Sequence, residues 1–233
     1  MARADGALGV RAANRVRLER AILNAATGII KKKGASALTI RGVAAKVDLA
    51  PSALYRYYPG LDALLTALIV AAYRDVEAAA ARAAERAARE PAQERALAVA
   101  LAVRRWAIAH PHRYSLIYGT PVPGYKAPTD TVDPASGVGR VLIGVLGAGG
   151  QPHEAPADDD AGRASAVDAE TAAAMGIPPH VAVHAIRLWT HLFGMISFEL
   201  FGHWVNVVAD PEEFFTAEVR RLVADVMEAA GTA

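Results

Sequence analysis

Apolar residues recur at helical spacing along most of the chain, whereas the alternation typical of strands is nowhere sustained. Residues 12–33 show the helical pattern clearly, and Gly34 follows where a helix commonly ends. Alanine, leucine, arginine and glutamate, which favour helices, dominate the long periodic stretches. We therefore predict an all-α fold. The apolar positions of the first predicted helix are Val16, Leu18, Ile22, Leu23, Ala26 and Ile29.

Residues that commonly start or end helices divide the rest of the chain. Thr39 is expected to cap a short helix over residues 40–47, and Pro51 to open another that ends near Tyr58. Loops are predicted over 119–134, which holds four prolines and two glycines, and over 147–165, where we expect flexibility. The other helices are predicted over 61–90, 91–110, 138–146, 178–208 and 211–230, with one or two turns over 111–118.

The composition is that of a folded protein, and it excludes several kinds of site. Hydrophobic residues make up 53% of the chain and charged residues 21%, which argues against disorder. The absence of cysteine excludes a disulfide scaffold, a thiolate zinc site and a cysteine nucleophile. No uncharged apolar run approaches the roughly 18 residues that cross a bilayer, and the N-terminus lacks the apolar core of a signal peptide. We expect a soluble, cytoplasmic protein with no membrane partner.

Charge is distributed unevenly although the net value is only +1. Residues 1–60 contain 11 Lys/Arg and 3 Asp/Glu, whereas residues 61–233 contain 14 and 21. A basic first quarter indicates contact with nucleic acid. A sticky N-terminal tail would produce the same balance, so the charge alone does not decide between them.

Residues 40–58 predict two short helices joined by a tight turn, which is the geometry of a helix-turn-helix. In such a unit the second helix enters the major groove and presents its N-terminal residues to the base edges. Arg56 and the hydroxyls of Ser52, Tyr55 and Tyr57 suit contacts with phosphates and bases. The apolar face that would join the two helices consists of Val43, Ala44, Val47 and Leu54.

Residues 21–66 resemble the DNA-binding domain of the TetR family of bacterial transcriptional regulators. The matching text is AILNAA, LTIRGVAAKV and PSALYRYYPGLDALLTAL, in that order. The resemblance implies an N-terminal three-helix DNA-binding domain over residues 12–60, with double-stranded operator DNA as its partner. The residues expected to contact DNA are Arg17, Thr39, Arg41, Pro51, Ser52, Ala53, Tyr55, Arg56 and Tyr57.

Three residues depart from the family pattern. Asp48 stands where the family usually has a turn glycine, and it tolerates the left-handed conformation less readily. Ala50 replaces the usual Ser or Thr cap, which removes about 1 kcal/mol unless Asp48 or Ser52 takes that role. Leu61 replaces a lysine that contacts phosphate in the family, so no such contact is assigned to it. A basic N-terminal arm would compensate through Arg11, Arg15, Arg17 and Arg20.

The C-terminal part contains a second resemblance. The stretches at 189–194 and 198–204, with the segment at 110–121, resemble the WHG type of TetR C-terminal domain. The resemblance implies that residues 61–233 form a helical bundle for ligand binding and homodimerisation. The helix predicted over 178–208 is apolar on all sides, which suits packing within one subunit and against a partner subunit. With the following helix it would form half of a four-helix bundle.

Ligand-binding residues are harder to assign, because buried aromatic side chains usually pack in a core without any ligand. The candidates for lining a site for a small, hydrophobic effector are Trp106, Tyr114, Tyr118, Trp189, Phe193 and Phe198. His180, His184 and His191 fall on one side of a helix, but the third is too far along it to share an ion with the others. We therefore predict no metal site and no cofactor.

Three functions compete at this stage. The first is a dimeric repressor that binds a palindromic operator and is released by its effector. The second is an enzyme, which we do not expect, since the sequence has no phosphate-binding glycine loop, metal motif or nucleophile elbow. The third is a helical protein-binding adaptor, which would leave the basic first quarter unexplained.

Overall fold

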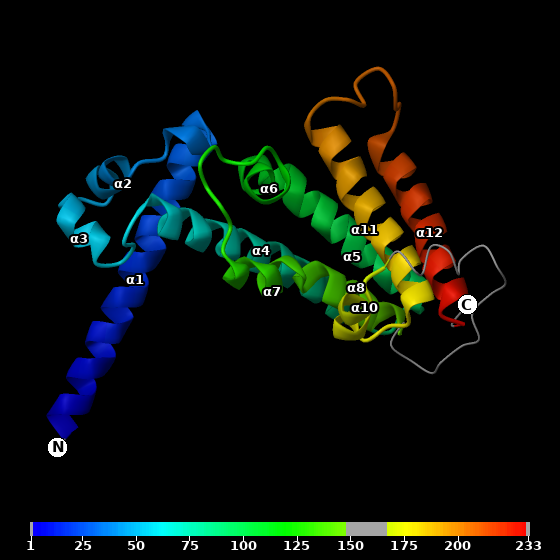
Figure 1. Ribbon diagram of the computed structural model, residues 1–233, viewed down its shortest axis with the longest axis horizontal. Coiled ribbons are helices and arrows are strands. Elements are labelled where there is room, and N and C mark those ends of the chain that lie inside the picture. Colours follow the sequence, from blue (N-terminus) through cyan, green and yellow to red (C-terminus); the bar gives the residue numbers. More distant parts are fainter. Residues whose placement is uncertain (1, 148–166, 232–233) are drawn as a thin grey trace. The chain divides into compact units, whose positions relative to one another are not determined.

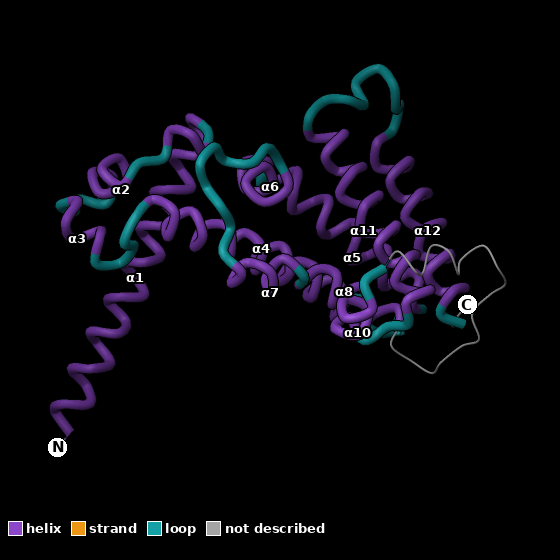
Figure 2. The backbone as a smooth tube through the Cα atoms, in the orientation of Figure 1, coloured by secondary structure: helices purple, strands orange, loops and turns teal. Residues whose placement is uncertain are grey.

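The computed structural model describes residues 2–147 and 167–231 (Figure 1). All regular structure in these ranges is helical, and no strand occurs in them (Figure 2). The described chain forms two compact units. One contains the residues up to Ala72 together with 112–132, and the other contains 73–111 together with the described residues from Asp133 onward. The all-α prediction is therefore confirmed.

The first unit is built around helix α1 (Ala2–Lys33). The short helices α2 (Ile40–Lys46) and α3 (Pro51–Tyr55) lie beside its C-terminal half, and its N-terminal half extends beyond them (Figure 1). The start of α4 (Leu61–Arg86), helix α6 (Pro111–Tyr118) and the short turns η1 (Ala35–Ala37) and η2 (Thr129–Thr131) complete the unit. Its core includes the fully buried residues Ile22, Ala26, Val43, Ala44, Leu54 and Leu64.

The second unit is a helical bundle. It contains the rest of α4 with α5 (Ala92–Ala109), α8 (Gly137–Leu146), α10 (Ala169–Met175), α11 (Pro179–Leu200) and α12 (Pro211–Ala229), and the short α7 (Val132–Ala135) leads into it. Helix α11 packs against α12, and both pack against α5, which also contacts α8. The buried faces of the bundle are lined by residues such as Val99, Val103, Leu192, Ile196, Phe215 and Leu222.

A buried arginine joins three helices of this bundle. Arg104 on α5 donates two hydrogen bonds of 2.7 Å to the Glu199 carboxylate on α11, and a third of 2.8 Å to Glu212 on α12. Its side chain is only 6% exposed, and its guanidinium lies 5.7 Å from the centre of the Phe215 ring. The hydrogen bond to Glu199 raises the pKa of Arg104 above its ordinary value, so the group stays charged.

Several predicted helix ends differ from the observed ones. Helix α1 already begins at Ala2, α3 ends at Tyr55, and α4 ends at Arg86. Helix α11 ends at Leu200 rather than at residue 208, because the positive φ angles of Gly202 (79°) and Asn206 (63°) lie outside the helical region. Helix α10 and the turns within 119–134 were not predicted, and residues 148–165 of the predicted flexible loop lie outside the described residues.

Helix α11 is the one described helix that is long and apolar enough to cross a membrane. Its packing indicates another role. It contacts α5, α10 and α12, and it carries the charged residues Arg187 and Glu199 within salt bridges. We interpret α11 as a helix packed within the bundle.

Candidate DNA-binding interface

The turn between α2 and α3 fixes the helix-turn-helix. Thr39 caps α2 as predicted, because its hydroxyl accepts a 3.0 Å hydrogen bond from the backbone N–H of Gly42. After α2 the chain reverses at Asp48, whose φ of 54° is left-handed. The backbone N–H of Leu49 then donates to the carbonyl of Ala44 at 2.9 Å, which closes the helix end. Asp48, which stands where the family usually has a turn glycine, therefore adopts the left-handed backbone conformation.

Helix α3 is held by a single buried side chain and by its own backbone. Leu54 is fully buried, whereas Pro51, Ser52 and Tyr55 are exposed. No side chain caps the helix at Ala50, so neither Asp48 nor Ser52 supplies the missing cap. The backbone satisfies one amide that a cap would serve, since the N–H of Ala53 donates to the carbonyl of Ala50 at 2.9 Å.

Most of the residues predicted to contact DNA are open to solvent. The exposed ones are Arg17, Thr39, Arg41, Pro51, Ser52, Tyr55 and Arg56, and the half-buried ones are Ala53 and Tyr57. All belong to the first unit. This helix-turn-helix buries an apolar face and leaves hydroxyl and guanidinium groups exposed on the opposite face. Such groups contact the phosphates and bases of DNA. Leu61, which departs from the family, packs instead against the core of this unit.

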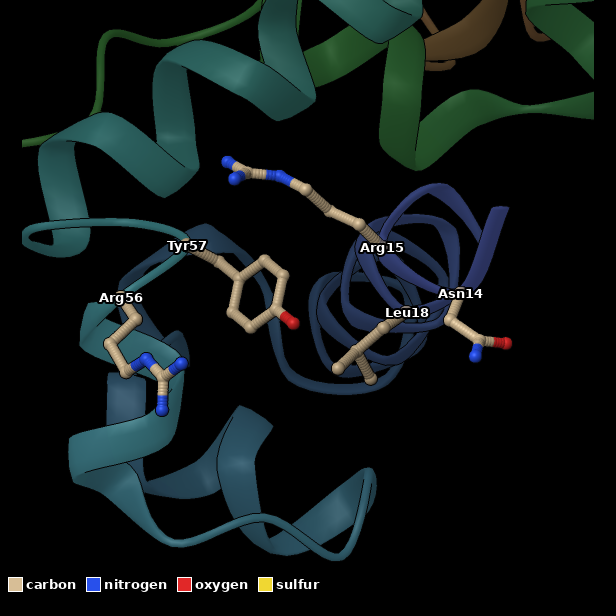
Figure 3. A pocket seen from close by; sticks show the side chains of 5 residues that line it. All are labelled: Asn14, Arg15, Leu18, Arg56 and Tyr57. Atoms are coloured by element: carbon tan, nitrogen blue, oxygen red, sulfur yellow. The ribbon is translucent and has the colours of Figure 1, made fainter. Parts of the chain in front are cut away.

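Helix α1 contributes to the same surface beside α3. A hollow of about 280 Å³ is lined by Arg56 and Tyr57, which follow α3, and by Asn14, Arg15 and Leu18 of α1 (Figure 3). Arg15 lies 5.7 Å from the centre of the Tyr57 ring and forms a 2.9 Å salt bridge with Glu19. The prediction named Arg15 only for its charge and missed Asn14, since nothing in local sequence shows which face of α1 meets α3.

Two pKa shifts arise beside this hollow. The hydrogen bond from Arg15 to Glu19 raises the pKa of Arg15 above its ordinary value. Burial raises the pKa of Tyr58, and the nearby charge of Glu19 adds to the effect. The surface therefore keeps its positive charge, and Tyr58 remains a neutral phenol.

Comparison with known proteins identifies the family. Residues 22–68 match the bacterial regulatory proteins of the tetR family, and residues 96–222 match the tetracyclin repressor-like C-terminal domain. The HTH-type transcriptional regulators Rv1816 of Mycobacterium tuberculosis and Mb1846 of Mycobacterium bovis are each 34% identical over 227 residues, covering 95% of this chain and 97% of theirs. The chain belongs to the TetR family. It is thus a transcriptional regulator with a helix-turn-helix domain.

Solved structures agree with this assignment of the TetR-family regulator. The crystal structure of the protein SCO4313 superposes with a TM-score of 0.73 at 32% identity, over 91% of this chain and 97% of that one. A protein of unknown function from Rhodococcus sp. RHA1 gives 0.64 at 22% identity, over 89% and 94% of the two chains. PfmR, a TetR family regulator from Thermus thermophilus, gives 0.52 at 16%, over 87% and 97%. The last two show the shared fold alone.

The residues predicted to line an effector site are divided between the two units. Tyr114 and Tyr118 contact each other in the first unit with ring centres 5.2 Å apart, whereas Trp106, Trp189 and Phe193 belong to the second. The rings of Trp189 and Phe193 have centres 4.5 Å apart. The remaining candidate, Phe198, is 53% exposed and lies against His203 rather than inside the bundle.

A stability test of the turn follows from the left-handed backbone at Asp48. Replacing Asp48 by glycine removes the steric cost of this conformation. Because glycine also gains freedom in the unfolded chain, we expect a net rise of only about 0.5–1 kcal/mol in the free energy of unfolding. Urea unfolding would measure it. The control, Ala45→Gly, lies within α2 and should lower stability by about 0.5–1 kcal/mol; a loss for D48G as well would contradict this interpretation of the turn.

Proposed function

We propose that this regulator is a repressor that binds a palindromic operator as a homodimer and is released by a small hydrophobic effector. The observation that supports this most directly is the α3 surface. Helix α3 buries Leu54 and leaves Ser52, Tyr55 and the following Arg56 open to solvent. The first 60 residues, which supply this surface, carry the excess of positive charge. That charge would neutralise phosphates while the exposed side chains read bases.

An exposed apolar face supports dimerisation. On α11, Ile186 and Phe198 are 39% and 53% exposed, and Phe201 follows directly after the helix at 48%. Phe214 on the adjoining α12 is 42% exposed. Several large apolar residues open to solvent on two packed helices indicate a surface that another molecule covers. A second copy would cover it symmetrically, and a two-fold dimer suits a palindromic site.

Release by an effector requires only that the effector favours one of two conformers. Family members bind DNA as dimers and bind small-molecule effectors. A difference in binding free energy of about 1–3 kcal/mol between the DNA-competent and the released conformer is sufficient. We propose that the effector acts in the second unit, where the buried Trp106 provides an apolar wall.

Selection from random duplex DNA tests the proposal. We expect a two-fold palindrome to be recovered, and its affinity to fall steeply as salt rises, because each neutralised phosphate releases counterions. Arg56→Ala should weaken binding to the selected palindrome by about tenfold or more, as for loss of a base or phosphate contact worth about 1–3 kcal/mol. Fluorescence anisotropy with labelled operator would measure both effects.

The matched control is Arg89→Ala, which removes an exposed arginine from the second unit. It should leave operator binding unchanged. Failure to retain any DNA at low salt would contradict the proposal and favour the protein-binding adaptor. Recovery of a half-site without two-fold symmetry would contradict the proposed homodimer but not operator binding.

A further inference from the structure

A groove of about 660 Å³ lies between α4 and α5 in the second unit. It is distinct from the Trp189–Phe193 cluster, because no residue of α8, α11 or α12 lines it. Its floor is apolar, and the groove exists because the small side chains on both helices leave space between them. The alanines that form this floor are Ala79, Ala83, Ala87, Ala98 and Ala102.

Positive charge surrounds the apolar floor. Arg82 and Arg86 on α4 and Arg105 on α5 line the groove, and all three reach solvent. None of them forms a salt bridge with another residue in the part of the chain that the structure describes. The only acidic residue in the lining is Glu90. Since residues 61–233 hold more Asp/Glu than Lys/Arg, this is a local basic site on an acidic part of the chain.

A rigid aromatic wall closes part of the groove. Trp106 is only 6% exposed, and its indole N–H donates a 2.9 Å hydrogen bond to the Asp75 carboxylate. Its ring also stacks on His110 with centres 5.5 Å apart. Because both contacts hold the indole in place, the groove offers a fixed apolar surface beside exposed cationic side chains.

We propose that this groove binds a small amphiphile with one anionic headgroup and an extended apolar body. The body would lie on the alanine floor against Trp106, and the headgroup would meet the arginines. A carboxylate and a phosphate monoester both fit this chemistry, because guanidinium groups pair with either. The proposal rests on the proposed function and deepens it, in that it gives the chemical class of the effector.

Charge argues against the other occupants of such a groove. A second copy placed symmetrically here would bring two clusters of Arg82, Arg86 and Arg105 together, which is repulsive. The DNA backbone would meet the arginines but would leave the alanine floor uncovered. An apolar body with an anionic end satisfies both features of the groove at once.

Calorimetric titration of the full-length protein without DNA tests the proposal, with dodecanoate, dodecyl phosphate and neutral dodecanol as monomeric probes. We expect at least one anionic probe to bind at one site per chain, and dodecanol to bind about tenfold more weakly or worse. Arg105→Glu should weaken the binding about tenfold or more, because charge reversal replaces attraction by repulsion. Ala98→Leu should weaken it by filling the groove, while keeping a residue that favours helix.

Arg89→Glu is the matched control, since it makes the same charge change nearby without lining the groove, and it should bind as the unchanged protein does. Binding that R105E and A98L both leave intact would overturn the proposal, as would binding of many probe molecules per chain or none. A lower molar mass for R105E in solution would also overturn it, by showing that a second copy covers the groove. Because DNA is absent, a failure here is distinguishable from a failure of operator binding.

Discussion

Replacing Arg104 by methionine is expected to lower the free energy of unfolding of the second unit by about 3–5 kcal/mol. The substitution keeps an unbranched side chain but leaves the Glu199 carboxylate, whose side chain is 17% exposed, without its two hydrogen-bond donors. An uncompensated charge in a largely buried place is costly, because the protein cannot replace the water that the charge has lost. Urea unfolding followed by circular dichroism would measure the loss.

Two further variants distinguish the contribution of the buried Arg104–Glu199 pair to stability from that of the more exposed Arg104–Glu212 pair. The double variant R104M/E199M should recover most of the lost stability, because two apolar side chains of similar volume can replace a buried ion pair. Glu212→Gln should cost less than about 1 kcal/mol, since the Glu212 side chain is 66% exposed and its pair is screened by water. Equal losses for R104M and E212Q would show that burial of the pair does not matter.

Replacing Leu54 by alanine is expected to destabilise the first unit by about 2–5 kcal/mol. Leu54 is 0% exposed and is the only fully buried side chain of α3. Its removal leaves a cavity under a helix of five residues that has no side-chain cap, so α3 has little else to hold it. Operator binding should fall with the stability, because the same helix carries the exposed residues proposed to contact DNA.

Tyr55→Ala is the control for that experiment. Tyr55 adjoins Leu54 in sequence, but it is 51% exposed, so its removal should change stability by no more than about 0.5 kcal/mol. We expect Y55A to weaken operator binding while the unfolding curve stays in place. If Y55A unfolds as readily as L54A, the two faces of α3 have been assigned the wrong way round.

The helix-turn-helix was predictable because its determinants are local. Thr39 as a cap, Pro51 at a helix start and Asp48 in the turn are each read from neighbouring residues, and the structure confirms their positions. Leu54 as the buried residue follows from helical spacing. The end of α3 was placed too late, since the sequence from Arg56 to Tyr58 continues the helical pattern although the regular helix ends at Tyr55.

The second unit was predictable as helices but not as contacts. Arg104 meets Glu199 and Glu212 across 95 and 108 residues of sequence, and no spacing rule connects positions so far apart. The groove likewise depends on which faces of α4 and α5 meet. The alanine-rich sequences of these two helices do not specify those faces. Phe198 was predicted to line a ligand site from its residue type, and in the structure its side chain is 53% exposed.

The Arg104 contacts also limit how the bundle can rearrange. If α5 turned about its own axis, the guanidinium would swing away from α11 and α12 together, and both carboxylates would lose their partner at once. We therefore expect small turns of α5 alone to be resisted, chiefly by the buried hydrogen bonds to Glu199 on α11. Because α5 lines the groove while α11 and α12 carry the exposed apolar face, we expect a displacement of α5 at the groove to shift that face as well.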